Sequence, residues 1–129
     1  MDCVLIDAPC TGAGTWRRRP DAKWRLSAAQ LAQRCGEQAA ILDAASKYVK
    51  PGGRLVYVTC SLFPSENAGQ IERFRAAHPE FAVSDHPARL AALIPGLPPE
   101  ETYLSGQGVT LTPRLTGTDG FFVSVMEKR

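Results

Sequence analysis

The stretch CVLIDAPC, residues 3–10, decides the fold of this chain, because it joins a strand-like run to a loop rich in reactive side chains. Its first six residues, CVLIDA, are mostly apolar, include β-branched side chains and lack strict alternation. Such a run predicts a strand buried on both faces, as in parallel sheets. The next residues, PCTGAGTWRRRPDAKW, mix glycine, proline and charge, which predicts a loop.

A second stretch, RLVYVTCS at residues 54–61, repeats the arrangement of an apolar run closed by a cysteine. Between the two runs, Ser27 is a suitable N-cap for a helix, and Pro51-Gly52-Gly53 turns the chain. Gln38 and its polar neighbours fall mostly on the other faces of this helix. The residues that recur at helical spacing, and so predict its buried stripe, are Leu31, Cys35, Ile41, Leu42, Ala45, Tyr48 and Val49.

A second helix is expected after the second strand. Pro64 suits a first helical position, Ser61 or Ser65 can cap it, and Glu66 favours the positive end of the helix dipole. The residues expected to face the core from this helix are Ile71 and Phe74.

The remaining chain holds weaker signals and one strong one. Residues 81–84 predict a short strand, and residues 85–118 predict a long irregular excursion with a short helix at 88–94. Residues 119–128, DGFFVSVMEK, predict a terminal strand that enters antiparallel, since no clear helix precedes it. The alternation predicts an α/β fold whose sheet is mostly parallel, with a C-terminal antiparallel strand.

Composition and length narrow the class of protein. A chain of 129 residues is long enough for one core, and 44% hydrophobic with 22% charged residues is typical of a soluble globular domain. No apolar run approaches the roughly 20 residues of a membrane span. The start, MDCVLIDAPC, lacks the features of a signal peptide, so a cytoplasmic protein is expected.

The four cysteines form no CxxC pair, and the two histidines are not spaced as metal ligands with them, so neither a disulfide framework nor a zinc site is expected. Cys3 and Cys35 are interpreted as buried, inert thiols. Cys10 and Cys60 follow the two strands, where a parallel sheet binds its ligands. If the strands are neighbours, both thiols and the Asp7 carboxylate meet at one rim. The helix start after Cys60 is expected to lower the pKa of that thiol.

The net charge of +2 is small, but basic side chains gather at residues 17–25, RRRPDAKWR. Two interpretations stand side by side. The cluster is either a solvated loop or a contact for phosphates, with Trp16 and Trp24 as surfaces for base stacking.

Three stretches together resemble one family. VLIDAPCTGAGTWRRRPDAKW (4–24), VKPGGRLVYVTCSLFPSENAGQI (49–71) and GTDGFFVSVMEK (117–128) are similar, in order and spacing, to the Sun family of RNA (cytosine-5) methyltransferases. The likeness is weakest over residues 85–112. It implies a partial Rossmann-like methyltransferase fold, S-adenosyl-L-methionine as cofactor, and RNA, expected to be rRNA, as substrate.

The resemblance also implies roles for single residues. Cys60 in TCS matches the nucleophile that attacks C6 of cytosine, and Cys10 in DAPC matches the cysteine that assists breakdown of the covalent product. Asp7 matches the acid beside cofactor and base, and Pro9 shapes the same loop at the cofactor. The residues expected to contact RNA are Arg17, Arg18, Arg19 and Lys23.

One part of the family pattern is not found. Members carry a glycine-rich loop after their first strand, whereas this chain starts at what resembles their fourth strand, and TGAGT (11–15) belongs to the DAPC loop. We therefore expect residues 1–129 to form the C-terminal part of a catalytic domain, without the cofactor-binding strands and any RNA-binding domain. Alone, it should bind the cofactor poorly and be inactive. Its bare strand at residues 3–8 is expected to favour a homo-oligomer.

Two other classes of function were considered. A non-catalytic RNA-binding module with inert thiols is the alternative to an enzyme. A thiol hydrolase needs a histidine near its nucleophile, and His78 and His86 follow the second helix, far from the strand ends.

Overall fold

The computed structural model describes residues 1–84, 103–112 and 117–129. The strands are β1 Cys3–Asp7, β2 Arg54–Thr59, β3 Phe81–Val83, β4 Tyr103–Ser105, β5 Gly108–Leu111 and β6 Phe121–Lys128. The helices are α1 Ala22–Arg25, α2 Ala28–Ser46 and α3 Ala68–Ala77, with 3-10 turns η1 Ala13–Thr15 and η2 Pro64–Glu66. In this part of the chain no helix is long and apolar enough to cross a membrane.

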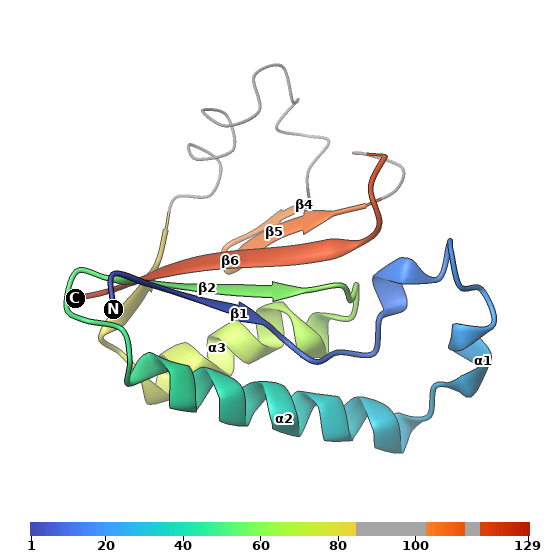
Figure 1. The fold of residues 1–129 in the computed structure, drawn as a ribbon, viewed down its shortest axis with the longest axis horizontal. Coiled ribbons are helices and arrows are strands. Elements are labelled where there is room, and N and C mark those ends of the chain that lie inside the picture. The colour runs from blue at the N-terminus through green and yellow to red at the C-terminus, as the bar shows by residue number, and fades with distance from the viewer. Residues whose placement is uncertain (85–102, 113–116) are drawn as a thin grey trace.

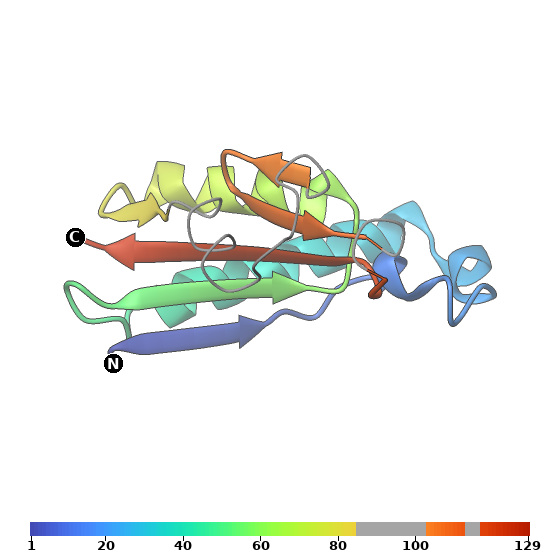
Figure 2. The same ribbon diagram turned by 90° about the horizontal axis from the view of Figure 1, so that it is seen from above.

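One sheet carries α2 and α3 against the same face (Figures 1 and 2). Its strand order is β1-β2-β6-β5-β4, and β3 pairs with the other end of β6. The α/β class and the antiparallel terminal strand are therefore confirmed. The sheet is less parallel than expected: among the described strands only β1 and β2 pair in parallel, because β3 and β5 both join the antiparallel β6.

The long helix α2 begins where the sequence predicts it but ends at Ser46, before the predicted stop at Pro51-Gly52-Gly53. Ser27 caps α2 through a full capping box, in which its hydroxyl accepts from the Gln30 backbone and the Gln30 side chain accepts from the Ser27 backbone. Leu42 and Val49 enter the core as expected. Gln38, expected on another face, is instead fully buried, because its amide has partners inside the protein.

The second helix begins less simply than expected. Pro64 opens the 3-10 turn η2, and the Phe63 backbone N–H donates to the Ser61 hydroxyl. The α-helix proper, α3, starts only after Asn67. Ile71 and Phe74 are completely buried, as predicted.

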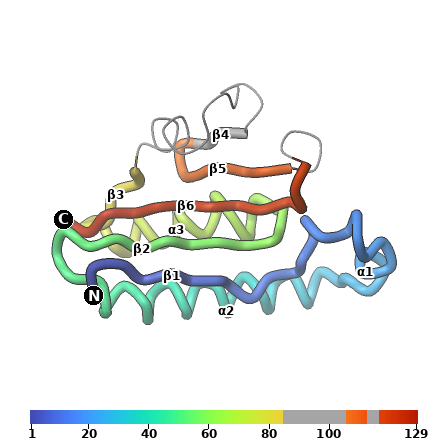
Figure 3. The backbone as a smooth tube through the Cα atoms, turned by 45° about the horizontal axis from the view of Figure 1, so that its top comes forward, coloured from blue at the N-terminus to red at the C-terminus, as the bar shows by residue number. Residues whose placement is uncertain are grey.

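The strand β1 is not buried on both faces, contrary to the prediction from its apolar run. Its helix-facing residue Ile6 is buried, but Cys3, Leu5 and Asp7 on the other face are exposed, Leu5 by 67%. The reason is that α2 and α3 cover only one face of the sheet; β1 also lies at its edge, with β2 on one side and no described strand on the other (Figures 1 and 3). The expectation of a buried Cys3 is thus wrong, and Cys35 is only half-buried.

The C-terminal region holds more structure than its sequence suggested. The predicted short strand is present as β3, and β4 and β5 form an antiparallel hairpin inside the segment expected to be irregular. The helix expected at 88–94 and His86 lie outside the described residues.

Candidate active site

Cys10 and Cys60 meet at the carboxyl edge of the parallel pair. Asp7, the last residue of β1, is in register with Val58 of β2, and each strand is followed within three residues by its cysteine. The Sγ atoms of Cys10 and Cys60 lie 3.2 Å apart, and both residues are half-buried. The expected convergence of the two thiols is therefore confirmed.

The contact between the sulfurs makes them share a proton. The hydrogen bond from Cys60 lowers the pKa of the Cys10 thiol from its ordinary value of 9.0 to about 6, although burial opposes this. The same hydrogen bond, together with burial and the charge on Cys10, raises the pKa of the Cys60 thiol. The expectation that Cys60 has a lowered pKa is wrong in this arrangement, because the sulfur contact and burial both raise the pKa of that thiol.

Alkylation against pH tests this assignment. Modification of Cys10 by iodoacetamide should rise with a midpoint of about 6, because the thiolate is the reactive form. In Cys60→Ala the hydrogen bond is gone, so the midpoint should move upward toward the ordinary value. Peptide mass spectrometry locates the label. An unchanged midpoint in Cys60→Ala would show that the sulfur contact does not set the pKa of Cys10.

Glu66 joins the loops that carry the two cysteines. It is fully buried, and one carboxyl oxygen accepts from the Thr11 backbone N–H at 2.8 Å and from Gln38 Nε2 at 3.1 Å. The other accepts from the Thr11 hydroxyl at 2.7 Å and from the Ser61 hydroxyl. Thr11 directly follows Cys10, and Ser61 directly follows Cys60, so this carboxyl group fixes the separation of the thiols.

Asn67 and Tyr57 hold the same loop from behind. The Thr59 hydroxyl donates to Asn67 Oδ1 at 2.6 Å, and Asn67 Nδ2 donates to the Ser61 carbonyl at 2.9 Å. The Tyr57 hydroxyl donates to the Glu66 carbonyl at 2.6 Å, and burial raises the pKa of Tyr57. The sequence predicted Glu66 at a helix start; what it did not predict is that Glu66 and Asn67 are both buried. The signal was a carboxylate and an amide placed soon after the second cysteine.

A third loop locks onto the first two through glycine. The Gly14 backbone N–H donates to the Cys60 carbonyl at 2.8 Å, and the Gly120 N–H donates to the Gly14 carbonyl at 2.8 Å. A Cβ on Gly14 would lie 2.1 Å from the Gly120 oxygen and 2.8 Å from the Cys60 oxygen. The three stretches whose sequences resemble one family therefore meet at Gly14, a position that only glycine fits.

Replacing Gly14 by alanine should therefore destabilise the protein by about 3 kcal/mol, since the clash is with backbone that has little room to move. Gly36, inside α2, is the matched control because a Cβ there would meet nothing within 4 Å. Gly36→Ala should raise stability by roughly 0.5–1 kcal/mol through helix propensity. Thermal unfolding of both variants is the measurement, and equal melting temperatures would contradict the proposed lock.

The other predicted site residues surround the thiols. Asp7 is exposed at the rim, and its charge contributes to the raised pKa of Cys60. The Pro9 carbonyl accepts from Gln38 Nε2 at 2.9 Å, which fixes the DAPC loop on α2. In TGAGT, Gly12 adopts a left-handed turn (φ 73°) and Gly14 packs against backbone, so these glycines serve the loop itself.

The basic residues divide into two groups. Arg17, Arg19 and Lys23 are exposed, and Lys23 lies 4.7 Å from the ring of Trp24, whose side chain is 81% exposed. Arg18 instead pairs with Asp119 at 2.6 Å, which ties the basic loop to the loop before β6. Trp16, the other predicted stacking surface, packs edge-on against the ring of Phe63.

The one described histidine does not approach the thiols. His78 ends α3, at the other end of the sheet from the carboxyl ends of β1 and β2 (Figure 1). Its ring stacks on Phe74, and its nitrogens contact Asp43 at 3.2 Å and Glu80 at 3.3 Å. Within the described residues the thiols therefore lack the imidazole partner that a thiol hydrolase uses.

Known proteins are similar to this chain in sequence. Residues 1–127 match the profile of the 16S rRNA methyltransferase RsmB/F family. Ribosomal RNA small subunit methyltransferase B of Photorhabdus laumondii is 40% identical over 129 residues, and that of Thermus thermophilus is 37% identical over 125 residues. These two matches span 100% and 97% of this chain. They span only 27% and 29% of the two relatives.

Solved structures agree with the sequence relatives. The crystal structure of PH0851 is 37% identical with a TM-score of 0.79, over 98% of this chain and 26% of that one. NSun6 from Pyrococcus horikoshii, solved with SFG, is 25% identical with a TM-score of 0.69, over 96% of this chain and 29% of that one. The chain therefore belongs to the 16S rRNA methyltransferase RsmB/F family.

Proposed function

We propose that this chain carries the catalytic cysteines of an S-adenosyl-L-methionine-dependent RNA (cytosine-5) methyltransferase that acts on small-subunit rRNA. The observation that supports this best is the 3.2 Å contact between the sulfurs of Cys10 and Cys60 at the carboxyl edge of β1 and β2. Two thiols at one rim, one of them able to accept the proton of the other, suit a reaction that adds a nucleophile to a ring and later releases it.

Cys60 is the proposed nucleophile. Its thiolate forms when its proton passes across the sulfur contact to Cys10, so that no other base is needed for this step. The thiolate then adds to C6 of cytosine, a C–S bond forms, and the electron pair of the C5–C6 double bond becomes available at C5. The carbon at C5 is a poor nucleophile before this addition and a competent one after it.

Cys10 and Asp7 complete the reaction. After C5 carries the methyl group, a water molecule takes its proton, the electrons of the C5–H bond re-form the C5–C6 double bond, and the bond from C6 to the Cys60 sulfur breaks to give the Cys60 thiolate. Cys10, beside that sulfur, assists this release as a thiol that returns the proton. Asp7, at the same rim, is positioned to hydrogen-bond the ring at N3 while charge develops there.

The cofactor site is only partly built by the described residues. S-adenosyl-L-methionine supplies an electrophilic methyl group when bound. Asp7 and the Pro9 loop fit one wall of its site, because both lie at the carboxyl edge where open α/β sheets bind ligands. Supporting this cofactor, the related NSun6 structure contains SFG, an analogue of S-adenosyl-L-methionine.

We propose that the chain is the C-terminal part of the catalytic domain, and that the preceding strands and a helix complete it against β1. A groove of about 380 Å³ beside β1 is lined by Met1, Val4, Ile41, Ala44, Ala45 and Tyr48. With the free edge of β1, this surface suits packing by further elements of the same domain. The alternative is that the free edge of β1 pairs with a second copy of this chain. In either case we expect the isolated chain to lack activity. An rRNA substrate also fits a cytoplasmic protein.

The test is direct. The full protein, incubated with S-adenosyl-L-methionine and small-subunit rRNA, should produce 5-methylcytosine detectable by mass spectrometry of nucleosides. RNA binding without any 5-methylcytosine would favour the alternative of a binding module with inert thiols.

A further inference from the structure

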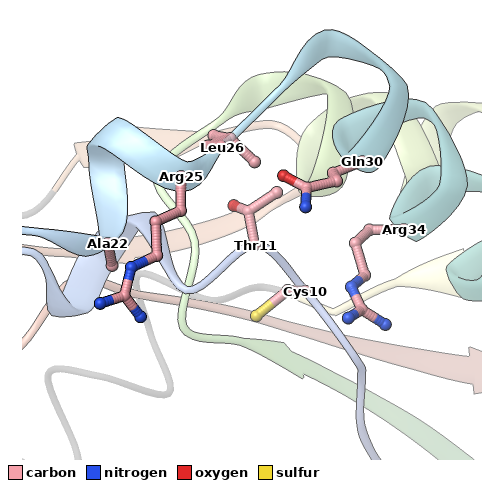
Figure 4. Close-up of a pocket in the computed structure, with 7 residues that line it drawn as sticks. All are labelled: Cys10, Thr11, Ala22, Arg25, Leu26, Gln30 and Arg34. Atoms are coloured by element: carbon pink, nitrogen blue, oxygen red, sulfur yellow. The ribbon is translucent and has the colours of Figure 1, made fainter.

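A cavity of about 190 Å³ opens beside Cys10, between the DAPC loop and the start of α2 (Figure 4). It is separate from the basic stretch at residues 17–19, none of whose side chains lines it. Its walls come from the DAPC loop, from α1 with the residue that follows it, and from the first part of α2. The lining residues are Cys10, Thr11, Ala22, Arg25, Leu26, Gln30 and Arg34.

The cavity presents cationic and amide donors around the thiol. The guanidinium groups of Arg25 and Arg34 lie on either side of Cys10, and the Gln30 side chain points into the space between them (Figure 4). None of the lining residues is acidic. An anion entering this space would meet two positive charges, one from α1 and one from α2, and the opposing charge of a Cys10 thiolate is removed once Cys10 accepts the proton of Cys60.

Both arginines are available for such an anion. Arg25 pairs with Asp21 at 2.8 Å and Arg34 with Glu37 at 2.9 Å, each one turn away on the same stretch of chain. Their side chains are 79% and 43% exposed. Exposed pairs of this kind contribute only about 0–1 kcal/mol. A ligand that offers two oxygens to a guanidinium can therefore replace them.

We propose that Arg25 and Arg34 bind a phosphodiester next to the target cytosine, and so position the base at the thiols. This inference rests on the proposed function. A cytosine that reaches Cys60 carries a phosphodiester on each side of its ribose, and the cavity begins at the partner thiol Cys10. Arginine matches phosphate oxygens with two parallel N–H bonds. Ala22 and Leu26 supply an apolar wall for the sugar.

The two arginines are thus positioning residues rather than catalytic ones. In the full protein, Arg25→Ala and Arg34→Ala should each raise KM for RNA by about tenfold, the value of one charge-assisted hydrogen bond, while kcat changes little. Arg34→Lys should recover part of the loss. Arg73→Ala is the matched control, since Arg73 is exposed to a similar degree (40%) and pairs with Asp43 on the far part of α2.

Chemically altered RNA identifies the phosphate. Oligonucleotides with one neutral methylphosphonate, placed in turn at each linkage around the target cytosine, should bind the wild type about tenfold more weakly at one linkage. The same substitution should have little further effect on Arg34→Ala or Arg25→Ala, because the contact is already lost. Fluorescence anisotropy measures this without any methylation, and melting temperatures verify that the variants are folded.

The outcomes separate the two proposals. If the wild type forms no 5-methylcytosine, the proposed function fails, and the binding cycle still tests the arginines. If folded Arg25→Ala and Arg34→Ala bind like Arg73→Ala, or if methylphosphonate weakens binding of wild type and both variants equally at every linkage, the phosphodiester site is refuted.

Discussion

Cys60→Ala is expected to abolish methylation, with a loss on the order of 10⁵-fold, as when other enzymes lose their nucleophile. The variant should also fail to form a covalent complex with RNA, because no sulfur is available to bond to C6. Cys10→Ala should behave differently: without the sulfur contact the pKa of Cys60 falls back toward its ordinary value of 9.0, so Cys60 still forms a thiolate and adds to the ring, while release slows and the adduct accumulates. The reason is the 3.2 Å sulfur contact, through which each thiol serves a different half of the reaction.

Denaturing gels of protein mixed with RNA and cofactor distinguish the two variants. A slower-migrating band should be strong for Cys10→Ala and missing for Cys60→Ala. Cys35→Ala is the control, since Cys35 is half-buried against η2 with a 3.5 Å contact from its sulfur to the Ser65 carbonyl and lies outside the thiol pair. A covalent band from Cys60→Ala and none from Cys10→Ala would reverse the assignment of the nucleophile.

Glu66→Ala is expected to cost about 3–5 kcal/mol of stability. The change leaves the Thr11 backbone N–H without its acceptor and leaves Gln38 Nε2 with the Pro9 carbonyl alone, since both donated to one oxygen of Glu66. It also frees the loops that hold the two cysteines, so any folded fraction should have a lower kcat. Unfolding followed by circular dichroism and a methylation assay give the two quantities.

Glu66→Gln is the informative companion. At the second oxygen of Glu66 both partners, Thr11 and Ser61, are hydroxyl groups, which can rotate and accept from an amide nitrogen. Glutamine can therefore keep all four contacts, and we expect a loss below about 1 kcal/mol. Glu72→Ala, on the exposed side of α3, should be neutral. If Glu66→Gln were as damaging as Glu66→Ala, the carboxyl group would have a role beyond joining the loops.

Local sequence signals predicted the elements that depend on neighbouring residues. The Ser27 cap, the chain turn at Pro51-Gly52-Gly53 and the buried Phe74 were all predicted from spacing and capping chemistry, although α2 itself ends earlier, at Ser46. The hairpin of β4 and β5 was not predicted, because its strands have three and four residues and gain their stability by pairing with β6. Short strands carry too little pattern to be distinguished from loops.

The site shows the same division. Its cysteines were found because each closes an apolar run, and their meeting followed from the parallel pairing of those runs. Gln38 and Glu66 were misjudged as surface or helix-end residues, because polar side chains are ordinarily exposed. Their burial is compensated by hydrogen bonds to each other and to groups of the two cysteine loops. Arg25 and Arg34 line the same cavity only because of the way the chain turns between α1 and α2.

By itself, then, the sequence determined the α/β class, the order of the main elements and the reactive residues, since these depend on periodicity and residue chemistry. Only the tertiary structure decided that the two sulfurs lie in contact, why Gly14 must be glycine, and that a buried carboxyl group joins the two cysteine loops. Those properties depend on distances of a few ångströms between residues up to about a hundred positions apart, and no local pattern encodes them.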